Sequence, residues 1–183
     1  YIDVGCYHPI DGNNTYLLYK KGWEGINIDL NKTSIDLFKR ARKNDNNLNV
    51  AISNNSKKIK FYYRKKINML NTINKKFAKN SFKKGFKTGS IQSQTLNSIL
   101  NKSKFKNKKI DFLNLDIEGN EINALESFDL KKYSPKLICI EIHNTSGRNT
   151  KNFLKNDPIY KFLCKKKYKY IWKNEFSYIF KRK

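Results

Sequence analysis

The chain has few of the residues that build disulfide-rich or metal-thiolate proteins. Its only cysteines are Cys6, Cys139 and Cys164, with no C-x-x-C pair, so neither a disulfide framework nor a cysteine zinc site is expected. No apolar run approaches the roughly 18 residues of a membrane span, and no secretory leader is visible. These absences predict a protein of a reducing, cytoplasmic setting without a membrane span. Because the first residue is Tyr rather than Met, we expect a truncated N-terminus.

Acidic residues are also scarce, and they are unevenly distributed. Lys and Arg number 39 against 15 Asp and Glu, which gives a formal net charge of +24. No acidic residue lies between Asn46 and Ile110, although Lys and Arg recur throughout that stretch. One interpretation is coding bias, because Asn, Lys, Ile, Tyr and Phe are all frequent. The other is an anionic partner, such as nucleic acid, a phosphorylated sugar or an acidic membrane surface.

The apolar runs alternate between strand-like and helix-like segments. A length of 183 residues suits a single domain over 1–183. Strands are expected at 1–5, 25–30, 48–53, 58–63, 110–116 and 136–142, helices at about 16–20, 34–43, 94–100, 118–127 and 158–167, and hairpin arms at 168–172 and 176–180. Such alternation predicts a three-layer α/β fold with a mostly parallel sheet. The stretch at about 64–90 is basic and weakly periodic, so we expect a mobile loop or basic insertion there.

Polar residues gather where four of the expected strands end. They are Asp3 through His8, Asp29, Asp116 through Glu118, and Glu141 through His143. The carboxyl ends of parallel strands share one edge of the sheet, and ligands bind at the switch point on that edge. Helix capping explains any one of these groups, but the four together predict a functional site.

The loop after the first strand is unsuited to phosphates. It lacks the G-x-G-x-x-G spacing that seats a pyrophosphate, and the chain has no G-x-x-x-x-G-K-[ST] motif. Tyr7 and Pro9 would also hinder a close approach of the backbone to phosphates. NAD, FAD and ATP are therefore poor candidates. Asp29 ends the second strand, where a carboxylate can accept both hydroxyls of a ribose, so a ribose cofactor without a pyrophosphate, S-adenosylmethionine, fits best.

Two segments of the sequence resemble the FkbM-type methyltransferase family. The first comprises YIDVG at 1–5, HP at 8–9, NTY at 14–16 and GWEGINID at 22–29. The second is IDFLNLDIEGNE at 110–121, which contains the aspartate-x-glutamate-glycine segment of that family. Each motif alone is moderately specific, but the pair in this order and at this separation is a strong signal.

The resemblance implies a Rossmann-like class I methyltransferase sheet that closes with a C-terminal β-hairpin. It also implies S-adenosylmethionine-dependent transfer, usually to a hydroxyl oxygen. It places Asp3 and Gly5 in the first cofactor motif, Asp29 on the ribose and residues 51–53 beside the adenine. Cys6 is a mild departure, because the family often has a small residue such as Ala there. The residues expected to contact the cofactor are Asp3, Gly5, Cys6, His8, Asn14, Asp29, Leu30 and Ile52.

Methyl transfer to oxygen requires an in-line arrangement and removal of the hydroxyl proton. Asp116, at the end of its strand, is the first candidate for the base or for orienting the acceptor. Glu118 and His143 are the alternates, and an imidazole has the better intrinsic pKa for a base near neutral pH. Mg²⁺ held by Asp116, Glu118 and Glu141 is an alternative, but no metal is expected.

Three functions follow as hypotheses. The first is O-methylation of a hydroxyl on a glycan or small molecule, with an anionic glycan or phosphorylated sugar suiting the basic stretch. The second is a nucleic-acid methyltransferase, in which Phe77, Phe82 and Phe86 stack on bases; the simpler interpretation is that they anchor the insertion to the core. The third is a non-catalytic anion-binding module. From charge alone we expect nucleic acid to bind only weakly and non-specifically.

Overall fold

The computed structural model describes residues 1–65, 67–143 and 153–183, so that Lys66 of the basic insertion lies outside the described residues. The central sheet is built from β1 (Ile2–Val4), β2 (Ile26–Asp29), β3 (Asn46–Asn49), β7 (Phe112–Leu115), β8 (Leu137–Glu141), β9 (Tyr168–Asn174) and β10 (Ser177–Arg182). Its order is β3-β2-β1-β7-β8-β10-β9. The first five strands in that order are parallel, and β10 is antiparallel to β8 and β9. The mostly parallel sheet with a closing hairpin is confirmed.

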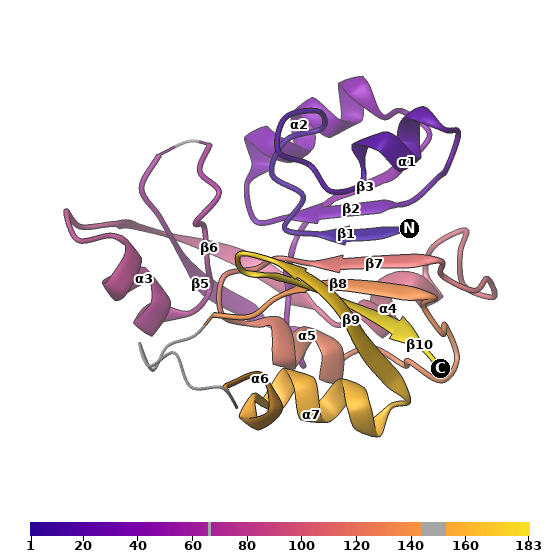
Figure 1. The fold of residues 1–183 in the computed structure, drawn as a ribbon. Helices are drawn as coiled ribbons and strands as arrows, with labels where there is room; N and C mark the ends of the chain where they lie inside the picture. Colours follow the sequence, from indigo (N-terminus) through magenta and orange to yellow (C-terminus); the bar gives the residue numbers. More distant parts are fainter. Residues whose placement is uncertain (66, 144–152) are drawn as a thin grey trace.

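Helices cover both faces of this sheet (Figure 1). On one face lie α1 (Tyr16–Lys20) and α2 (Lys32–Ala41), and on the other α4 (Leu96–Asn101), α5 (Glu121–Glu126) and α7 (Pro158–Lys165). From β1, the sheet extends to β2 and β3 on one side and to β7 and β8 on the other. Right-handed crossovers therefore place the helices of the two halves on opposite faces of the sheet. The central strands are buried and rich in Ile and Leu, but β1, β2 and β7 each also contain a buried polar residue, Asp3, Asn27 and Asn114 respectively. No helix within the described ranges is long and apolar enough to cross a membrane.

Several element boundaries differ from the prediction. α2 begins at Lys32, two residues earlier than expected, because the side chain of Asn31 caps it. α5 begins at Glu121 instead of residue 118, because the preceding loop takes positive φ angles at Glu118 and Gly119 that no helix allows. The short α6 (Phe153–Asn156) has no counterpart in the prediction.

The expected strand at 48–53 is divided in two. β3 ends at Asn49, and after Val50 the two-residue β4 (Ala51–Ile52) leaves the central sheet. β4 pairs in parallel with β6 (Lys87–Gln94), which also pairs antiparallel with β5 (Lys58–Tyr63). These three strands form a second sheet in the order β4-β6-β5.

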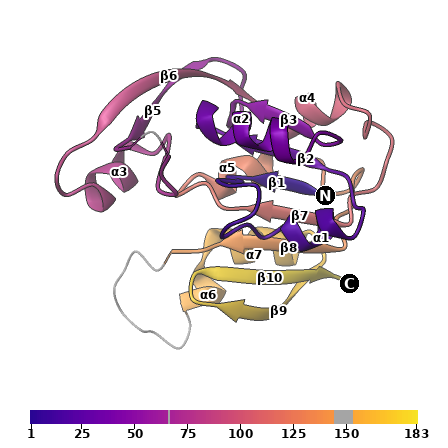
Figure 2. The same cartoon turned by 90° about the horizontal axis from the view of Figure 1, so that it is seen from above.

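Part of the stretch at 64–90, where we expected a mobile loop or basic insertion, has regular secondary structure. This basic insertion contains α3 (Lys75–Ser81), capped by Asn74, and the first part of β6. Phe82 is buried against Tyr62 and Ala78, with Phe86 packed beside them, so apolar contacts fix α3 to β5. Figures 1 and 2 place α3, β5 and β6 beyond the carboxyl ends of the parallel strands. The basic insertion is therefore a folded unit at the edge where the site was predicted.

Candidate active site

The ends of β1 and β7 touch through the backbone of Gly5. A Cβ placed on Gly5 would lie 1.7 Å from the carbonyl oxygen of Asp116, and Gly5 has a φ of +81°. The backbone N–H of Asp116 in turn donates to the carbonyl of Val4 over 3.0 Å. Only glycine permits both this φ and so close an approach of the two backbones. Gly5 therefore allows direct contact between the two segments that resemble the FkbM family, at 1–5 and 110–121.

Asp3 is buried and forms hydrogen bonds with the loop that follows β1. Its Oδ2 accepts from the hydroxyl of Thr15 (2.7 Å) and the side-chain amide of Asn13 (3.0 Å), and its Oδ1 accepts from the amide of Asn114 (2.9 Å). The amide of Asn14 donates to Asn114 over 3.0 Å. Asp3 lines the second cavity described below, but its oxygens are occupied by the chain itself. Its evident role is to hold the loop in place.

Arg42 supports the same loop and was missed in the sequence. It is 1% exposed, and its guanidinium donates to the carbonyl of Pro9 (2.6 Å), Asn13 Oδ1 (2.6 Å) and Thr15 Oγ1 (2.8 Å). The ring of Phe38 lies 4.8 Å from the guanidinium carbon. Arg42 sits in a run of basic residues, and composition alone does not distinguish it from its exposed neighbours.

A first cavity of about 450 Å³ opens beside the ends of β1, β2 and β4. Asp29 lies in its wall and accepts from the backbone N–H groups of Tyr7 (2.8 Å) and Asn31 (2.7 Å). Burial raises the pKa of Asp29 to about 6, although these two donors favour the charged form. Each oxygen keeps a further lone pair for a ligand. The cavity is lined by Val4, Gly5, Ile28, Asp29, Leu30, Val50, Ile52, Asn68, Met69, Asn71, Ile73, Asp116, Ile117 and Asn120.

A second cavity of about 600 Å³ adjoins the first, since Gly5, Met69 and Asp116 line both. Cys6 lines it but is buried against Ile35 and Phe38. Burial raises the pKa of the Cys6 thiol well above its ordinary value, which excludes a thiolate. The second cavity is lined by Asp3, Gly5, Cys6, Tyr7, Gly12, Asn13, Asn14, Met69, Leu70, Asn114, Asp116, Glu118 and Glu141.

His8 lies apart from these two cavities. Its Nδ1 accepts from the backbone N–H groups of Ile10 (3.3 Å) and Asp11 (3.0 Å), and it lines neither cavity. The imidazole therefore stabilises the turn that follows it. Of the residues expected to contact the cofactor, Gly5, Asp29, Leu30 and Ile52 line the first cavity, and Asp3, Gly5, Cys6 and Asn14 line the second.

Four carboxyl groups form an acid cluster at the ends of β7 and β8: Asp116, Glu118, Glu121 and Glu141. Glu118 has a φ of +59°, and its carbonyl accepts from the hydroxyl of Thr72 over 2.8 Å. Glu121 is buried rather than solvated, and its carboxylate accepts from the backbone N–H groups of Ile117 (3.0 Å) and Gly119 (3.1 Å). The acid cluster is thus held by its own loop and by the basic insertion.

Burial and mutual repulsion alter the protonation of this cluster. Desolvation, followed by the carboxyl of Glu141, raises the pKa of Asp116 to about 9. Burial raises the pKa of Glu121 to about 7 and also raises that of Glu118. The carboxylates of Glu118 and Glu141 raise the pKa of His143 to about 10. A region with this many carboxyl groups favours bound positive charge.

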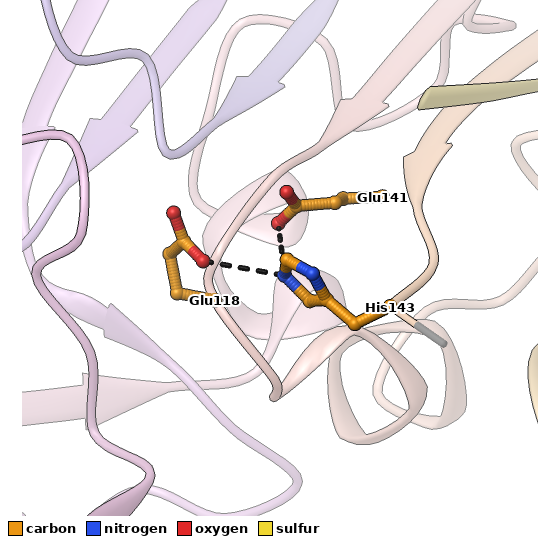
Figure 3. A group of neighbouring side chains, drawn as sticks. All are labelled: Glu118, Glu141 and His143. Carbon is orange, nitrogen blue, oxygen red and sulfur yellow. Dashed lines mark ion pairs between the residues drawn. The ribbon is translucent and has the colours of Figure 1, made fainter. Parts of the chain in front are cut away.

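His143 completes the cluster. Its Nε2 lies 3.3 Å from Glu118 Oε2 and 3.0 Å from Glu141 Oε2, and Figure 3 shows both carboxylates converging on the ring. These atoms are within ion-pair distance, yet all three are buried without a partner in hydrogen-bond geometry. The three side chains could hold a metal ion, because their ligand atoms lie within 4.8 Å of one another. Asp116, one of the three residues of the Mg²⁺ alternative, is not in this group.

An outer cavity of about 1060 Å³ lies on the far side of Glu141, which also lines the second cavity. The rings of Phe77 and Phe176 lie 5.2 and 5.5 Å from the imidazole of His143. The outer cavity is lined by Asn74, Lys76, Phe77, Asn80, Gly119, Glu121, Ile122, Glu141, Ile142, His143, Asp157, Pro158 and Ile159.

The basic insertion, which the sequence linked to an anionic acceptor, contributes to all three cavities. Met69 and Asn71 line the first cavity, and Lys76 and Phe77 line the outer one. The amide of Asn74 donates to the carbonyl of Gly119 over 2.9 Å. No local pattern predicts such contacts, because they join segments far apart in the chain.

The model of the family described as Methyltransferase FkbM domain matches residues 3–170 of this chain. No curated protein and no solved structure gives a significant match. The matched range includes both segments that carry the resemblance in the sequence, so the resemblance is confirmed. FkbM methyltransferases use S-adenosylmethionine, and the expected cofactor is therefore confirmed as well.

Proposed function

Since the chain belongs to the FkbM methyltransferase domain family, we propose that it methylates a hydroxyl oxygen on a glycan or another small molecule. One observation carries this proposal: the acid cluster lies between the inner cavities and the outer one. Asp116 lines both inner cavities, and Glu141 lines the second and the outer cavity. A methyl donor and an acceptor that enter from opposite sides would meet at the acid cluster, where a carboxyl group can orient the acceptor hydroxyl or, in its charged form, accept the proton.

The lining of the inner cavities supports binding of the cofactor there. Asp29 presents a free lone pair on each oxygen, suited to ribose hydroxyls, and the side chains of Leu30 and Ile52 provide an apolar wall for the adenine. The carboxyl groups of the second cavity suit an ammonium and a sulfonium. When bound, S-adenosylmethionine supplies an electrophilic methyl group. Asp3, Asn13 and Thr15 hold the loop that forms one wall of this site.

Asp116 is the proposed base or acceptor-orienting group, because it alone of the three catalytic candidates lines both inner cavities. Glu118, which lines the second cavity, and His143, which lines the outer one, are the alternates. Asp116→Asn keeps the shape of the side chain but removes the carboxylate. We expect turnover to fall on the order of 10²–10⁴-fold, while affinity for S-adenosylhomocysteine stays nearly constant.

The experiment measures transfer of a radiolabelled methyl group from S-adenosylmethionine to a panel of neutral, acidic and phosphorylated sugars. Calorimetry with S-adenosylhomocysteine measures cofactor affinity separately. Glu126→Gln, an exposed acid at the end of α5, is the matched control and should be fully active. If Asp116→Asn keeps full turnover while His143→Ala loses it, Asp116 is not the base and His143 is the residue that the reaction requires. Methyl transfer to nitrogen only would refute the proposed O-methylation.

The packing of the aromatic residues weighs against the nucleic-acid alternative. Phe82 is buried, Phe86 packs against its cluster, and Phe77 lies beside His143, so these rings do not form an open stacking surface. Lys76 in the wall of the outer cavity instead supports a small anionic acceptor. A non-catalytic module would have no need of a buried acid cluster beside a cofactor site.

We also propose that residues 1–183 act as one catalytic domain, with the basic insertion as its acceptor-facing part. Contacts from Thr72 and Asn74 to the β7–α5 loop support this organisation. Cys6, Cys139 and Cys164 are free thiols, which agrees with the proposed cytoplasmic setting.

A further inference from the structure

We propose that Glu118, Glu141 and His143 bind a divalent transition-metal ion, such as Mn²⁺ or Zn²⁺, in the wall between the second and outer cavities. The three side chains come from the β7–α5 loop, the last residue of β8 and the segment just after it. Their converging atoms are Glu118 Oε2, Glu141 Oε2 and His143 Nε2 (Figure 3).

Two of the three spacings among these atoms are those of ligands around one ion. His143 Nε2 lies 3.3 and 3.0 Å from the two carboxylate oxygens, and all three ligand atoms fall within 4.8 Å of one another. Two donors that each lie about 2.1 Å from a metal at angles of roughly 90–110° are about 3.0–3.4 Å apart. No large rearrangement of the side chains would be needed to admit the ion.

The second observation is that these buried atoms form ion pairs with one another but, in the part of the chain that the structure describes, no hydrogen bond of normal geometry. Glu118 is 5% exposed and Glu141 is 9% exposed, and within the described residues their Oε2 atoms and His143 Nε2 have no hydrogen-bond partner. Buried carboxylate and imidazole atoms without hydrogen bonds are costly. A metal ion between these atoms would coordinate all three at once. A protonated His143 carries a single positive charge, which would leave one of the two carboxylates without a compensating charge.

The donor set indicates the kind of ion. Two carboxylate oxygens and one imidazole nitrogen suit Mn²⁺, Fe²⁺ or Zn²⁺ better than Mg²⁺, which prefers oxygen ligands alone and near-ideal octahedral geometry. Three protein ligands also leave open positions, as in catalytic metal sites. Because Glu141 lines both the second and the outer cavity, an ion held there would be placed to polarise an acceptor hydroxyl. This role rests on the proposed function, but the binding of the ion does not.

The net charge of the chain makes the test unusually clean. At +24 the protein repels cations at long range, so adventitious surface binding is disfavoured. Mn²⁺ alone is titrated into the metal-free chain, without cofactor or acceptor, and free Mn²⁺ is counted by electron paramagnetic resonance. We expect one saturable site per chain, weakened at least tenfold in Glu141→Gln and in His143→Ala, and unchanged in the control Glu126→Gln. No saturable site in the unaltered chain, or equal affinity in all variants, would overturn the proposal.

A second measurement on the unaltered chain avoids any folding defect of a variant. The chain has two histidines, His8 and His143, and the ¹H NMR resonances of their rings can be assigned with His8→Gln. Zn²⁺ should shift the resonance of His143 and leave that of His8 in place, and the reverse pattern, or no shift, would contradict the site. Metal binding without methyl transfer would refute the proposed function alone, whereas methyl transfer that resists chelators in a chain without a metal site would refute only this inference.

Discussion

Replacing Arg42 by Met should remove the internal support of the first loop while keeping the length of the side chain. The carbonyl of Pro9 accepts from both Nε and an Nη of Arg42, over 3.1 and 2.6 Å, and would lose both donors. Asn13 Oδ1 and Thr15 Oγ1 would each lose one charged donor but keep their bonds to each other. A buried acceptor left without its donor costs about 1–3 kcal/mol, so we expect a total loss of about 3 kcal/mol.

Urea unfolding followed by circular dichroism measures this loss as a lower midpoint with an unchanged slope. For a chain of this size the melting temperature should fall by roughly 6–12 °C, at about 2–4 °C per kcal/mol. Arg40→Met, an exposed change on α2, is the matched control and should stay within about 0.5 kcal/mol of the unaltered chain. A loss below about 1 kcal/mol in Arg42→Met would refute the view that the guanidinium holds the loop.

Two further predictions concern ligands. The pKa of Asp29 is raised to about 6, and the ribose hydroxyls need its charged carboxylate. Affinity for S-adenosylhomocysteine, measured by calorimetry, should therefore fall about tenfold from pH 7 to pH 5. An affinity that does not change with pH, or the same pH dependence in Asp29→Asn, would contradict this. If the acceptor is anionic, Lys76→Glu should raise KM several-fold at low salt and flatten its salt dependence, whereas Lys84→Glu, exposed and outside the outer cavity, should change KM little. An unchanged KM in Lys76→Glu would indicate that the charge has no part in acceptor binding.

The parts of the fold that the sequence predicted are those with local signals. Ile2 and Val4 in β1, and Leu113 and Leu115 in β7, are fully buried, and parallel strands buried on both faces are apolar runs that need no partner to be recognised. Asp29 could be placed at the site because a strand end fixes its position on the sheet edge. Gly5 could be assigned to the same edge because it ends the first strand, directly before a turn.

The parts that could not be predicted depend on partners far away in the chain. The stretch 48–52 contains no Gly or Pro to mark a break, and β4 leaves the central sheet to pair with β6, more than thirty residues later. Glu121 resembles any solvated acid on a helix, yet its carboxylate accepts from the loop before it. α3 has only seven residues, most of them polar. So short a segment contains too few apolar residues for a helical period to be recognised in the sequence.

The basic insertion explains how one chain can combine so much positive charge with a buried acid cluster. Its lysines lie on a unit that contacts the acid cluster through neutral groups, the hydroxyl of Thr72 and the amide of Asn74, and within the described residues none of its lysines is paired with a carboxylate of the cluster. The acids are therefore left to bind protons or cations, while the positive surface is left to attract anions. An acceptor that carries an anionic group and a hydroxyl could use both at once, with its charge on the insertion and its hydroxyl at the carboxyl groups.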